Sequence, residues 1–423
     1  MIKKNIKIAI IGLGYVGLPL AIEFGKKYNV IGYDKNKIRV NQLNKKIDLN
    51  GDIEKKEFIH SKKLLFSFNE SSIEKCNIYI IAVPTPINKN KTPNLKYIDY
   101  ACITISKYIK KNDIVILEST VYPGLTEDYV APLIQKKSNL LFNIDFFCGY
   151  SPERINPNDK IHNLINITKI TSGSTQRISK FVDNLYKSII KAGTFNVKNI
   201  KIAEAAKVIE NSQRDINIAF INELTLIFNR MKINTDEVLK AASTKWNFMN
   251  FKPGLVGGHC IGVDPYYLTY SSKKLGYLPK IISSGRAIND NYPKFIASEA
   301  IKKSKNIFNK KNLRFLIMGF AFKENCRDFR NSKSIDLYKI LIKKNIKVDC
   351  YDSLINEEKI NKNCNIKLIK NLKKNTYNCI IIAVAHNNFK KMGYKSIQNL
   401  LVKKGFIFDI KNIFKYNKRN LYL

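Results

Sequence analysis

The chain has 423 residues, of which 45% are hydrophobic, and it carries a formal net charge of +39. Because this length exceeds what one hydrophobic core usually serves, two or three domains are expected. Such a charge would favour nucleic acid or an anionic membrane if it were clustered, but the lysines are scattered singly and in pairs from Lys3 to Lys418. We therefore expect soluble behaviour, no specific nucleic-acid partner and only diffuse attraction for anionic substrates.

The N-terminal stretch and the cysteines both favour a cytoplasmic protein. The basic, apolar start MIKKNIKIAIIGLGYVGLPLAIEFG resembles a signal peptide, but glycines, a proline and Glu23 interrupt it and no small-residue cleavage site follows. The sequence has no run of 18 or more uninterrupted apolar residues, so we expect no membrane-spanning helix. The eight cysteines form no CxxC pair, so reduced thiols without a disulfide framework are expected.

A glycine-rich turn follows the first expected strand. Residues 6–11 (IKIAII) have the pattern of a buried strand and residues 18–27 that of a helix. The turn between them has the GxGxxG spacing, with Gly12, Gly14 and Gly17. In a βαβ unit the first glycine permits a tight turn, the second lets the backbone approach a pyrophosphate, and the third lets the helix pack closely on the strand. The helix N-terminus then faces the phosphate.

The next expected strand, NVIGYD, ends at Asp34, 20 positions after the second glycine. A carboxylate at this position accepts hydrogen bonds from the adenosine ribose and repels a 2′-phosphate. The sequence therefore predicts NAD rather than NADP as the cofactor. The cofactor-binding residues expected in this segment are Gly12, Gly14, Tyr15, Val16, Gly17, Asp34 and Arg39.

Two further strands are expected within residues 76–86 and 112–124, and hydroxyl residues follow their apolar runs. In an open α/β sheet the loops after the strand C-termini line the ligand crevice. Thr85 and Thr120 are therefore candidates for contacts with cofactor or substrate, the alternative being that they only cap helices.

The remaining pattern predicts an α/β protein with two Rossmann-type, doubly wound domains joined by a long central helix and a helical dimerisation region. Residues 198–233 have apolar spacings of three and four without Gly or Pro, which is typical of a long helix and suits a dimer contact. The later strand–Gly319–helix–strand pattern ends at Asp352 and repeats the opening in degenerate form. It lacks the full glycine fingerprint, so we expect it to take the nucleotide of a substrate rather than a second NAD. The expected domains are 1–197, 198–305 and 306–423.

Cys260 lies in the segment GGHCIGVDP, where glycines expose the backbone around it. Such a thiol can be a nucleophile, a metal ligand or a small buried side chain. The metal interpretation is disfavoured, because His259 is adjacent and no second pair of ligands is present. Seen alone, the segment leaves the nucleophilic and the packing interpretations open.

Seven stretches in order along the chain resemble the nucleotide-sugar 6-dehydrogenases, the UDP-glucose and GDP-mannose dehydrogenase superfamily. They are GLGYVGLPLA, VPTP, ESTVYPG, SPERINP, EAAKVIENSQRDINIAFINE, GGHCIGVDPYYL and GFAFKENCRDFRNS. The resemblance implies oxidation of a sugar C6 alcohol to a carboxylate with two NAD in succession, in support of surface polysaccharide synthesis. Cys260 would capture the intermediate aldehyde as a thiohemiacetal and later carry a thioester.

The resemblance also implies roles for the other residues of these stretches. Lys207 and Asn211, four apart on one helix face, would act on C6 and its oxyanion. Asp264 and Thr120 would position water or tune Lys207, and Glu153 would act as the base towards the thioester. The catalytic residues so implied are Cys260, Lys207, Asn211, Asp264, Glu153 and Thr120.

Two departures from the UDP-glucose branch indicate a different sugar. That branch has a glutamate where this chain has Pro157, and a serine where it has His259. The motifs resemble the branch acting on UDP-N-acetylhexosamines (UDP-GlcNAc or UDP-GalNAc), with UDP-glucose as the alternative substrate and a non-catalytic nucleotide-binding protein as the alternative class. Arg330 would reach cofactor phosphate, and the substrate-binding residues implied are Glu153, Arg154, Lys207, Asn211, Gly257 and Lys323.

Overall fold

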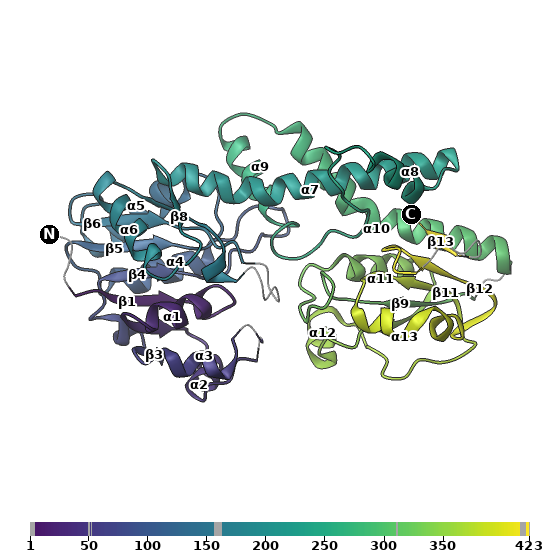
Figure 1. The fold of residues 1–423 in the computed structure, drawn as a ribbon, viewed down its shortest axis with the longest axis horizontal. Coiled ribbons are helices and arrows are strands. Elements are labelled where there is room, and N and C mark those ends of the chain that lie inside the picture. Colours follow the sequence, from purple (N-terminus) through teal and green to yellow (C-terminus); the bar gives the residue numbers. More distant parts are fainter. Residues whose placement is uncertain are drawn as a thin grey trace. The chain divides into compact units, whose positions relative to one another are not determined.

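A computed structural model describes residues 5–49, 51, 53–155, 163–309, 312–414 and 420–422. The chain divides into two compact units, each built around a parallel sheet (Figure 1). Unit 1 comprises Met1–Glu210 and Tyr266–Tyr277, and unit 2 comprises Asn211–Pro265 and Leu278–Leu423. The three-domain division at residues 197 and 305 stays a prediction. Within the described ranges, no helix combines the length and the apolar character needed to cross a membrane.

Unit 1 contains an eight-stranded sheet in the order β3-β2-β1-β4-β5-β6-β7-β8, in which only β6 and β7 pair antiparallel. Its first six positions have the doubly wound order of dinucleotide-binding domains, in which the strand order reverses between the parallel neighbours β1 and β4. The strands are β1 Lys7–Ile11, β2 Asn29–Tyr33, β3 Leu64–Ser67, β4 Ile78–Ile81, β5 Asp113–Leu117, β6 Phe146–Tyr150, β7 Lys169–Gly173 and β8 Thr194–Asn196. The α/β fold class expected from the sequence is confirmed.

Helices cover both faces of this sheet. On one face Ile8 and Ile10 of β1 pack with apolar residues of α1 and α6. The intervening Ala9, with Tyr79 and Val115 of the neighbouring strands, is also buried, so the opposite face is covered as well. The helices of unit 1 are α1 Gly17–Gly25, α2 Lys37–Asn44, α3 Lys55–His60, α4 Lys96–Ser106, α5 Ala131–Ser138 and α6 Gln176–Lys187, to which α9 Asp264–Lys274 adds most of its length.

The expected long helix is present as α7, Ile200–Met231. Over its unit 2 part, α7 packs against α10, Lys280–Phe308, through buried polar pairs. The Asn222 amide donates to Asn289 Oδ1 at 2.8 Å, and the Thr225 and Tyr292 hydroxyls lie 2.7 Å apart. These two polar residues of α7, Asn222 and Thr225, are therefore hydrogen-bonded to a partner helix rather than solvated. A short helix, α8 Thr235–Ala242, follows α7.

Unit 2 contains a five-stranded parallel sheet in the order β10-β9-β11-β12-β13, the second common doubly wound order. The strands are β9 Arg314–Met318, β10 Lys347–Tyr351, β11 Tyr377–Ile382, β12 Leu401–Asp409 and β13 Leu421–Tyr422. Three helices accompany them: α11 Lys333–Lys343, α12 Glu357–Cys364 and α13 Asn387–Gln398.

The two sheets repeat one local geometry at the end of their first strands. Gly12 and Gly319 both have positive φ, of 97° and 98°. The N–H of Gly319 donates to the carbonyl of Tyr351, as that of Gly12 does to Tyr33. In unit 2, however, the carboxylate that follows is engaged by a buried imidazole, since His386 Nε2 lies 3.2 Å from Asp352 Oδ2. Unit 2 thus shares the strand-end geometry but not the open acid of a dinucleotide site.

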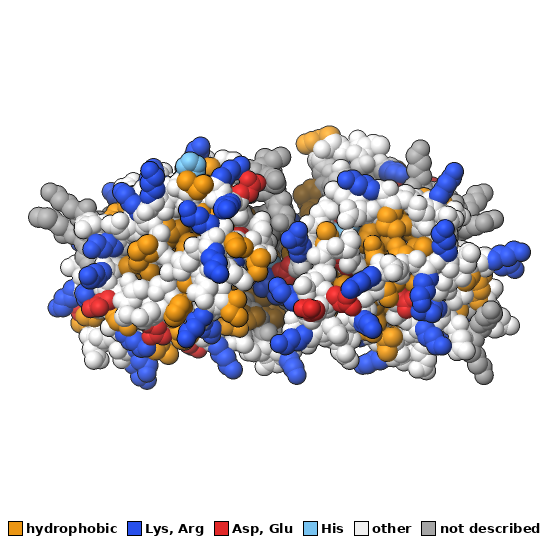
Figure 2. Space-filling view, turned by 90° about the horizontal axis from the view of Figure 1, so that it is seen from below, with side chains coloured by type: hydrophobic (Ala, Val, Ile, Leu, Met, Phe, Trp, Pro, Cys, Tyr) orange, Lys and Arg blue, Asp and Glu red, His pale blue; other side chains and the backbone are white. Residues whose placement is uncertain are grey.

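Figure 2 shows lysine and arginine side chains spread across one face, interspersed with uncharged and apolar ones. No extended basic stripe is drawn on this face. This distribution agrees with the scattered positions of the lysines in the sequence and with a charge excess that is general rather than concentrated at one site.

Candidate functional site

The GxGxxG turn has the close packing that its glycines were expected to permit. A Cβ on Gly17 would lie 1.9 Å from the carbonyl oxygen of Gly12, and one on Gly12 would lie 2.7 Å from a backbone oxygen just past β4. Gly14 has nothing within 4 Å of its Cβ position, so its backbone is open to an approaching group. Tyr15 and Val16, between these glycines, are half-buried.

Asp34 and Arg39 are fixed on the same turn. Asp34 accepts hydrogen bonds from the N–H groups of Leu13 and Asn36, both at 2.9 Å. The Arg39 guanidinium donates to the Leu13 carbonyl at 3.0 Å and to Asp48 at 2.6 Å, and its third nitrogen is buried without a hydrogen-bond partner. An open backbone beside a carboxylate fits a dinucleotide with free ribose hydroxyls.

The loops after β4 and β5 are tied down by neighbours within unit 1. The Tyr267 hydroxyl of α9 donates to the carbonyl of Thr85 at 2.9 Å. Ser119 donates to the carbonyl of Val83 at 2.7 Å, which joins the two strand ends. Thr120, the next residue, is half-buried. Both candidate threonines therefore lie in ordered loops at the carboxyl edge of the sheet, where ligands of doubly wound sheets bind.

A buried acid on α7 holds the loop that carries Thr120. Glu204 accepts from the N–H of Gly124 at 2.5 Å and from the N–H and hydroxyl of Thr126 at 2.9 and 2.6 Å. Burial raises the pKa of Glu204 to about 7. Lys207 follows one helical turn later and is 7% exposed. The structure thus links the Thr120 loop to the part of α7 that bears Lys207.

Glu153 and Arg154 follow β6 and differ in their surroundings. Glu153 is buried, and its Oε1 accepts hydrogen bonds from the N–H groups of Arg154 and Ile155. The Arg154 guanidinium donates to the Thr168 carbonyl at 2.9 Å and pairs with Glu210 at 2.7 Å. The expected role of Arg154 in substrate binding stays a prediction. Pro157 lies outside the described residues.

In unit 2, three of the expected catalytic residues come together. The Asn211 amide donates to Asp264 Oδ2 at 2.6 Å, and both side chains are buried. The N–H of Asp264 in turn donates to the carbonyl of Cys260 at 2.8 Å. Asp264 therefore connects α7 to the turn that presents the thiol.

Cys260 differs from six of the other seven thiols in accessibility. It and Cys364 are the two of the eight cysteines that are not buried. Burial raises the pKa of each of the other seven: Cys76, Cys102, Cys148, Cys326, Cys350, Cys364 and Cys379. A thiol whose pKa is raised by burial is a poor nucleophile, so exposure and position single out Cys260.

The paired glycines before Cys260 pack against the loop that follows β9. A Cβ on Gly257 would lie 2.4 Å from the carbonyl oxygen of Asn331, and one on Gly258 would lie 2.7 Å from the Phe322 ring. His259 packs edge-on to the same ring and lies 3.7 Å from Asp328. The glycines thus let the thiol-bearing loop approach the residue 322–331 loop closely.

Lys323 and Arg330 are both on that second loop. The Lys323 ammonium lies 5.8 Å from the centre of the Phe322 ring. Two nitrogens of the exposed Arg330 guanidinium donate hydrogen bonds to Asp328 Oδ2, Nε at 2.9 Å and Nη2 at 2.5 Å. Their expected contacts with sugar nucleotide and cofactor phosphate stay predictions.

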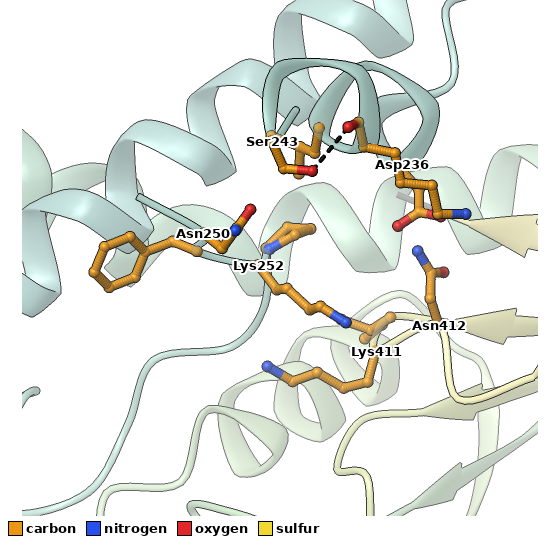
Figure 3. A pocket seen from close by; sticks show the side chains of 11 residues that line it. Asp236, Ser243, Asn250, Lys252, Lys411 and Asn412 are labelled. Atoms are coloured by element: carbon orange, nitrogen blue, oxygen red, sulfur yellow. Dashed lines mark hydrogen bonds and ion pairs between the residues drawn. The ribbon is translucent and has the colours of Figure 1, made fainter. Parts of the chain in front are cut away.

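A pocket of about 310 Å³ lies within unit 2, at the carboxyl end of β12 (Figure 3). Lys252 and Lys411 enter it from two different segments, and Lys240 of α8 also lines it. The Lys411 ammonium packs against Gly254, where a Cβ would lie 2.1 Å from Nζ, and burial lowers the pKa of this lysine. The lining combines cations with Phe251, Leu239 and Ile410, a mixture suited to an anionic group joined to a ring.

Comparison with known proteins assigns both units to one protein family. The NAD-binding domain of the UDP-glucose/GDP-mannose dehydrogenase family matches residues 6–190, its central domain residues 201–291 and its UDP-binding domain residues 316–416. The chain is 49% identical to the UDP-N-acetyl-D-glucosamine 6-dehydrogenase of Pseudomonas aeruginosa over 421 residues, which covers 99% of this chain and all of that one.

The chain belongs to the UDP-glucose/GDP-mannose dehydrogenase family. A Salmonella typhi enzyme named UDP-N-acetyl-D-glucosamine 6-dehydrogenase is also 49% identical, over 97% of this chain and 96% of its own. The solved structure of a UDP-D-ManNAc dehydrogenase from Pyrococcus horikoshii superposes with a TM-score of 0.87 at 29% identity, covering 99% of both chains. Family membership makes this chain an NAD-dependent oxidoreductase of nucleotide sugars, which confirms the expected cofactor and enzyme class.

Several residues that build the dehydrogenase site were not among the sequence candidates. Glu204, which holds the Thr120 loop, and Tyr267, which holds the Thr85 loop, both fall within the quoted family stretches. Glu118 and Lys169, buried next to Glu153, were also missed. A usable signal existed for Glu118, because an acid directly after the five-residue apolar strand β5 must be paired when it is buried.

Proposed function

We propose that the chain oxidises the C6 alcohol of UDP-N-acetylglucosamine to the carboxylate, with Cys260 as covalent nucleophile. The observation that carries the proposal is the 49% identity, over essentially the full length of both chains, to an enzyme named for this reaction. The partly exposed thiol of Cys260, beside a buried Asn211–Asp264 pair, supports a covalent step. The uronic acid formed would serve surface polysaccharide synthesis in the cytoplasm.

The proposed chemistry assigns one task to each residue. Bound NAD supplies the hydride acceptor for both oxidations. Lys207 stabilises the C6 oxyanion, with Asn211 assisting by hydrogen bond. The Cys260 thiolate adds to the aldehyde carbon, and the resulting thiohemiacetal is oxidised to a thioester. Glu153 then removes a proton from water as the water oxygen bonds to the thioester carbon, the C–S bond breaks, and the thiol regains a proton.

We further propose that the pocket of unit 2 binds the uridine diphosphate portion of the substrate. Lys240, Lys252 and Lys411 supply cations for the two phosphates, and Phe251 supplies an apolar surface for the base. Its place just after β12 is where doubly wound sheets bind ligands. The UDP-binding domain of the family covers residues 316–416, which include part of this lining.

A homodimer is also proposed, since unit 2 exposes large apolar side chains at regular spacing. Phe220, Ile227 and Met231 of α7 are 55%, 42% and 58% exposed, and their spacing of seven and four places them on one helix face. Trp246 and Ile281 are 92% and 72% exposed. Aromatic, methionine and aliphatic side chains of this kind are typical of the buried centre of an interface between protein subunits.

The test of the reaction is NADH formation, followed at its absorbance, with UDP-GlcNAc, UDP-GalNAc and UDP-glucose. We expect two NADH per UDP-GlcNAc consumed and a higher kcat/KM for this sugar than for the other two. A preference for UDP-glucose would establish the alternative substrate instead. No NADH with any of the three sugars would contradict the proposed function.

A further inference from the structure

A buried group of charged side chains lies behind Glu153 in unit 1. The Lys169 ammonium, at the start of β7, donates to Glu118 Oε2 at 2.6 Å and to the Pro152 carbonyl at 2.9 Å. The Tyr186 hydroxyl of α6 donates to the other oxygen of Glu118. Lys169 is 2% exposed, Glu118 and Tyr186 are fully buried, and the ammonium also lies 5.5 Å from the centre of the Tyr186 ring.

The same ammonium faces the carboxylate of Glu153. Oε1 of Glu153 is satisfied by two backbone N–H groups, whereas Oε2 is buried without a hydrogen-bond partner. Lys169 Nζ lies 3.7 Å from this Oε2, within ion-pair distance. Among the described residues, Lys169 therefore provides the cation that balances the unsatisfied carboxylate oxygen.

Two carboxyl groups, those of Glu118 and Glu153, share this single ammonium. Burial raises the pKa of Glu118 to about 7, although Lys169 acts in the opposite direction. As Glu118 takes up a proton towards acidic pH, more of the charge of Lys169 becomes available to Glu153. The other cation nearby, Arg154, pairs with Glu210.

We propose that Lys169 is a positioning residue for Glu153. Held by Glu118 and Tyr186, it orients the free carboxylate oxygen and favours the ionised form that accepts the proton of water. This inference rests on the proposed function, because it assigns Glu153 the hydrolytic step. It predicts that loss of Lys169 impairs hydrolysis of the thioester more than it impairs either oxidation.

Lys169→Met removes the ammonium and retains much of the side-chain volume. Because both oxidations precede hydrolysis, the variant should release a rapid burst of about two NADH per active site and then turn over roughly tenfold to a hundredfold more slowly. The thioester-linked enzyme should accumulate and be visible by intact-protein mass spectrometry. The acidic limb of the kcat profile should move to higher pH, because the positive charge beside the carboxylate is lost.

Glu118→Gln separates an electrostatic role of Lys169 from a purely structural one. The amide resembles protonated Glu118 and still offers an oxygen to Lys169, so the acidic limb should stay at the wild-type pH even where the rate changes. Lys303→Met, in unit 2, is the matched control. Lys303 is a partly buried lysine whose ammonium donates to the Asn420 carbonyl at 2.8 Å, far from Glu153 in sequence, and this variant should keep the wild-type profile.

Circular-dichroism melts of each variant show whether it is folded before its kinetics are compared. The inference is overturned if folded Lys169→Met shows neither a burst nor a shifted acidic limb. It is also overturned if Glu118→Gln moves the limb upward as far as Lys169→Met does. If the wild-type enzyme itself forms no NADH from UDP-GlcNAc, the proposed function fails instead, so the two failures are distinguishable.

Discussion

Cys260 is the residue on which the covalent scheme depends. In Cys260→Ser the hydroxyl is a weaker nucleophile towards the aldehyde, so we expect the reaction to stall before both oxidations are complete. The measurement is NADH per UDP-GlcNAc consumed, which should fall below two, with kcat reduced by roughly a hundredfold or more.

The matched control at this scale is Cys364→Ser, which changes the other thiol that is not buried. It should retain the wild-type stoichiometry and rate. Iodoacetamide should label Cys260 fastest, and substrate should protect it selectively. Two NADH per sugar at the wild-type rate from Cys260→Ser would disprove the covalent role.

Individual site residues were predictable from the sequence where a motif fixes their spacing. Gly12, Gly17 and Asp34 belong to a local pattern whose chemistry requires those residue types. The partners of Glu153 were not predictable in this way. Lys169 meets Glu118 across 51 positions, and Tyr186 meets the same acid across 68, so no local periodicity could relate them.

The turn between β1 and α1 offers a test at the scale of one element. In Gly17→Ala, a methyl group would lie 1.9 Å from the Gly12 carbonyl oxygen, so α1 must move and the free energy of unfolding should fall by about 1–3 kcal/mol. In Gly14→Ala the methyl group enters open space, so thermal stability should be unchanged.

NAD affinity distinguishes the two glycine variants further. Gly14→Ala should weaken NAD binding by roughly tenfold, because the methyl group occupies the space through which the pyrophosphate approaches the backbone. Isothermal titration calorimetry measures the affinity and differential scanning calorimetry the stability. Wild-type NAD affinity in Gly14→Ala would show that the pyrophosphate does not use this approach.

Strands and long helices were predictable because burial imposes a period on the sequence, whereas their polar contacts were not. The apolar spacing within residues 198–233 predicted one helix, and α7 runs from Ile200 to Met231. The apolar spacing did not indicate which residue would form a hydrogen bond with Asn222. The structure pairs it with Asn289 and with the backbone of Gly254, because α10 and the thiol-bearing loop both pack against α7 there.

At the scale of the whole molecule, the incomplete repeat of the strand–glycine–helix pattern explains how one chain has both an NAD-binding and a UDP-binding domain. Both sheets keep the strand-end glycine with positive φ, at Gly12 and Gly319. Only unit 1 keeps the further glycines of the fingerprint, while in unit 2 His386 engages Asp352. The sequence showed the missing glycines, but the burial of His386 against Asp352 depends on the packing of β11 beside β9 and was visible only in the fold.

The proposed dimer can be followed through the single tryptophan of the chain, Trp246, which is 92% exposed in the isolated subunit. If α7 and the Trp246 segment form the interface, the fluorescence of Trp246 should be blue-shifted at micromolar protein concentration. It should move to longer wavelength on dilution, as light scattering reports dissociation.

Ile227→Glu should weaken dimerisation by about tenfold or more, since a carboxylate would be buried at the contact. Leu65→Glu, at an exposed position of β3 in unit 1, is the matched control and should dimerise normally. A monomer of 48.7 kDa at all concentrations, or a dimer in which Trp246 keeps the emission of an exposed indole, would contradict this interface.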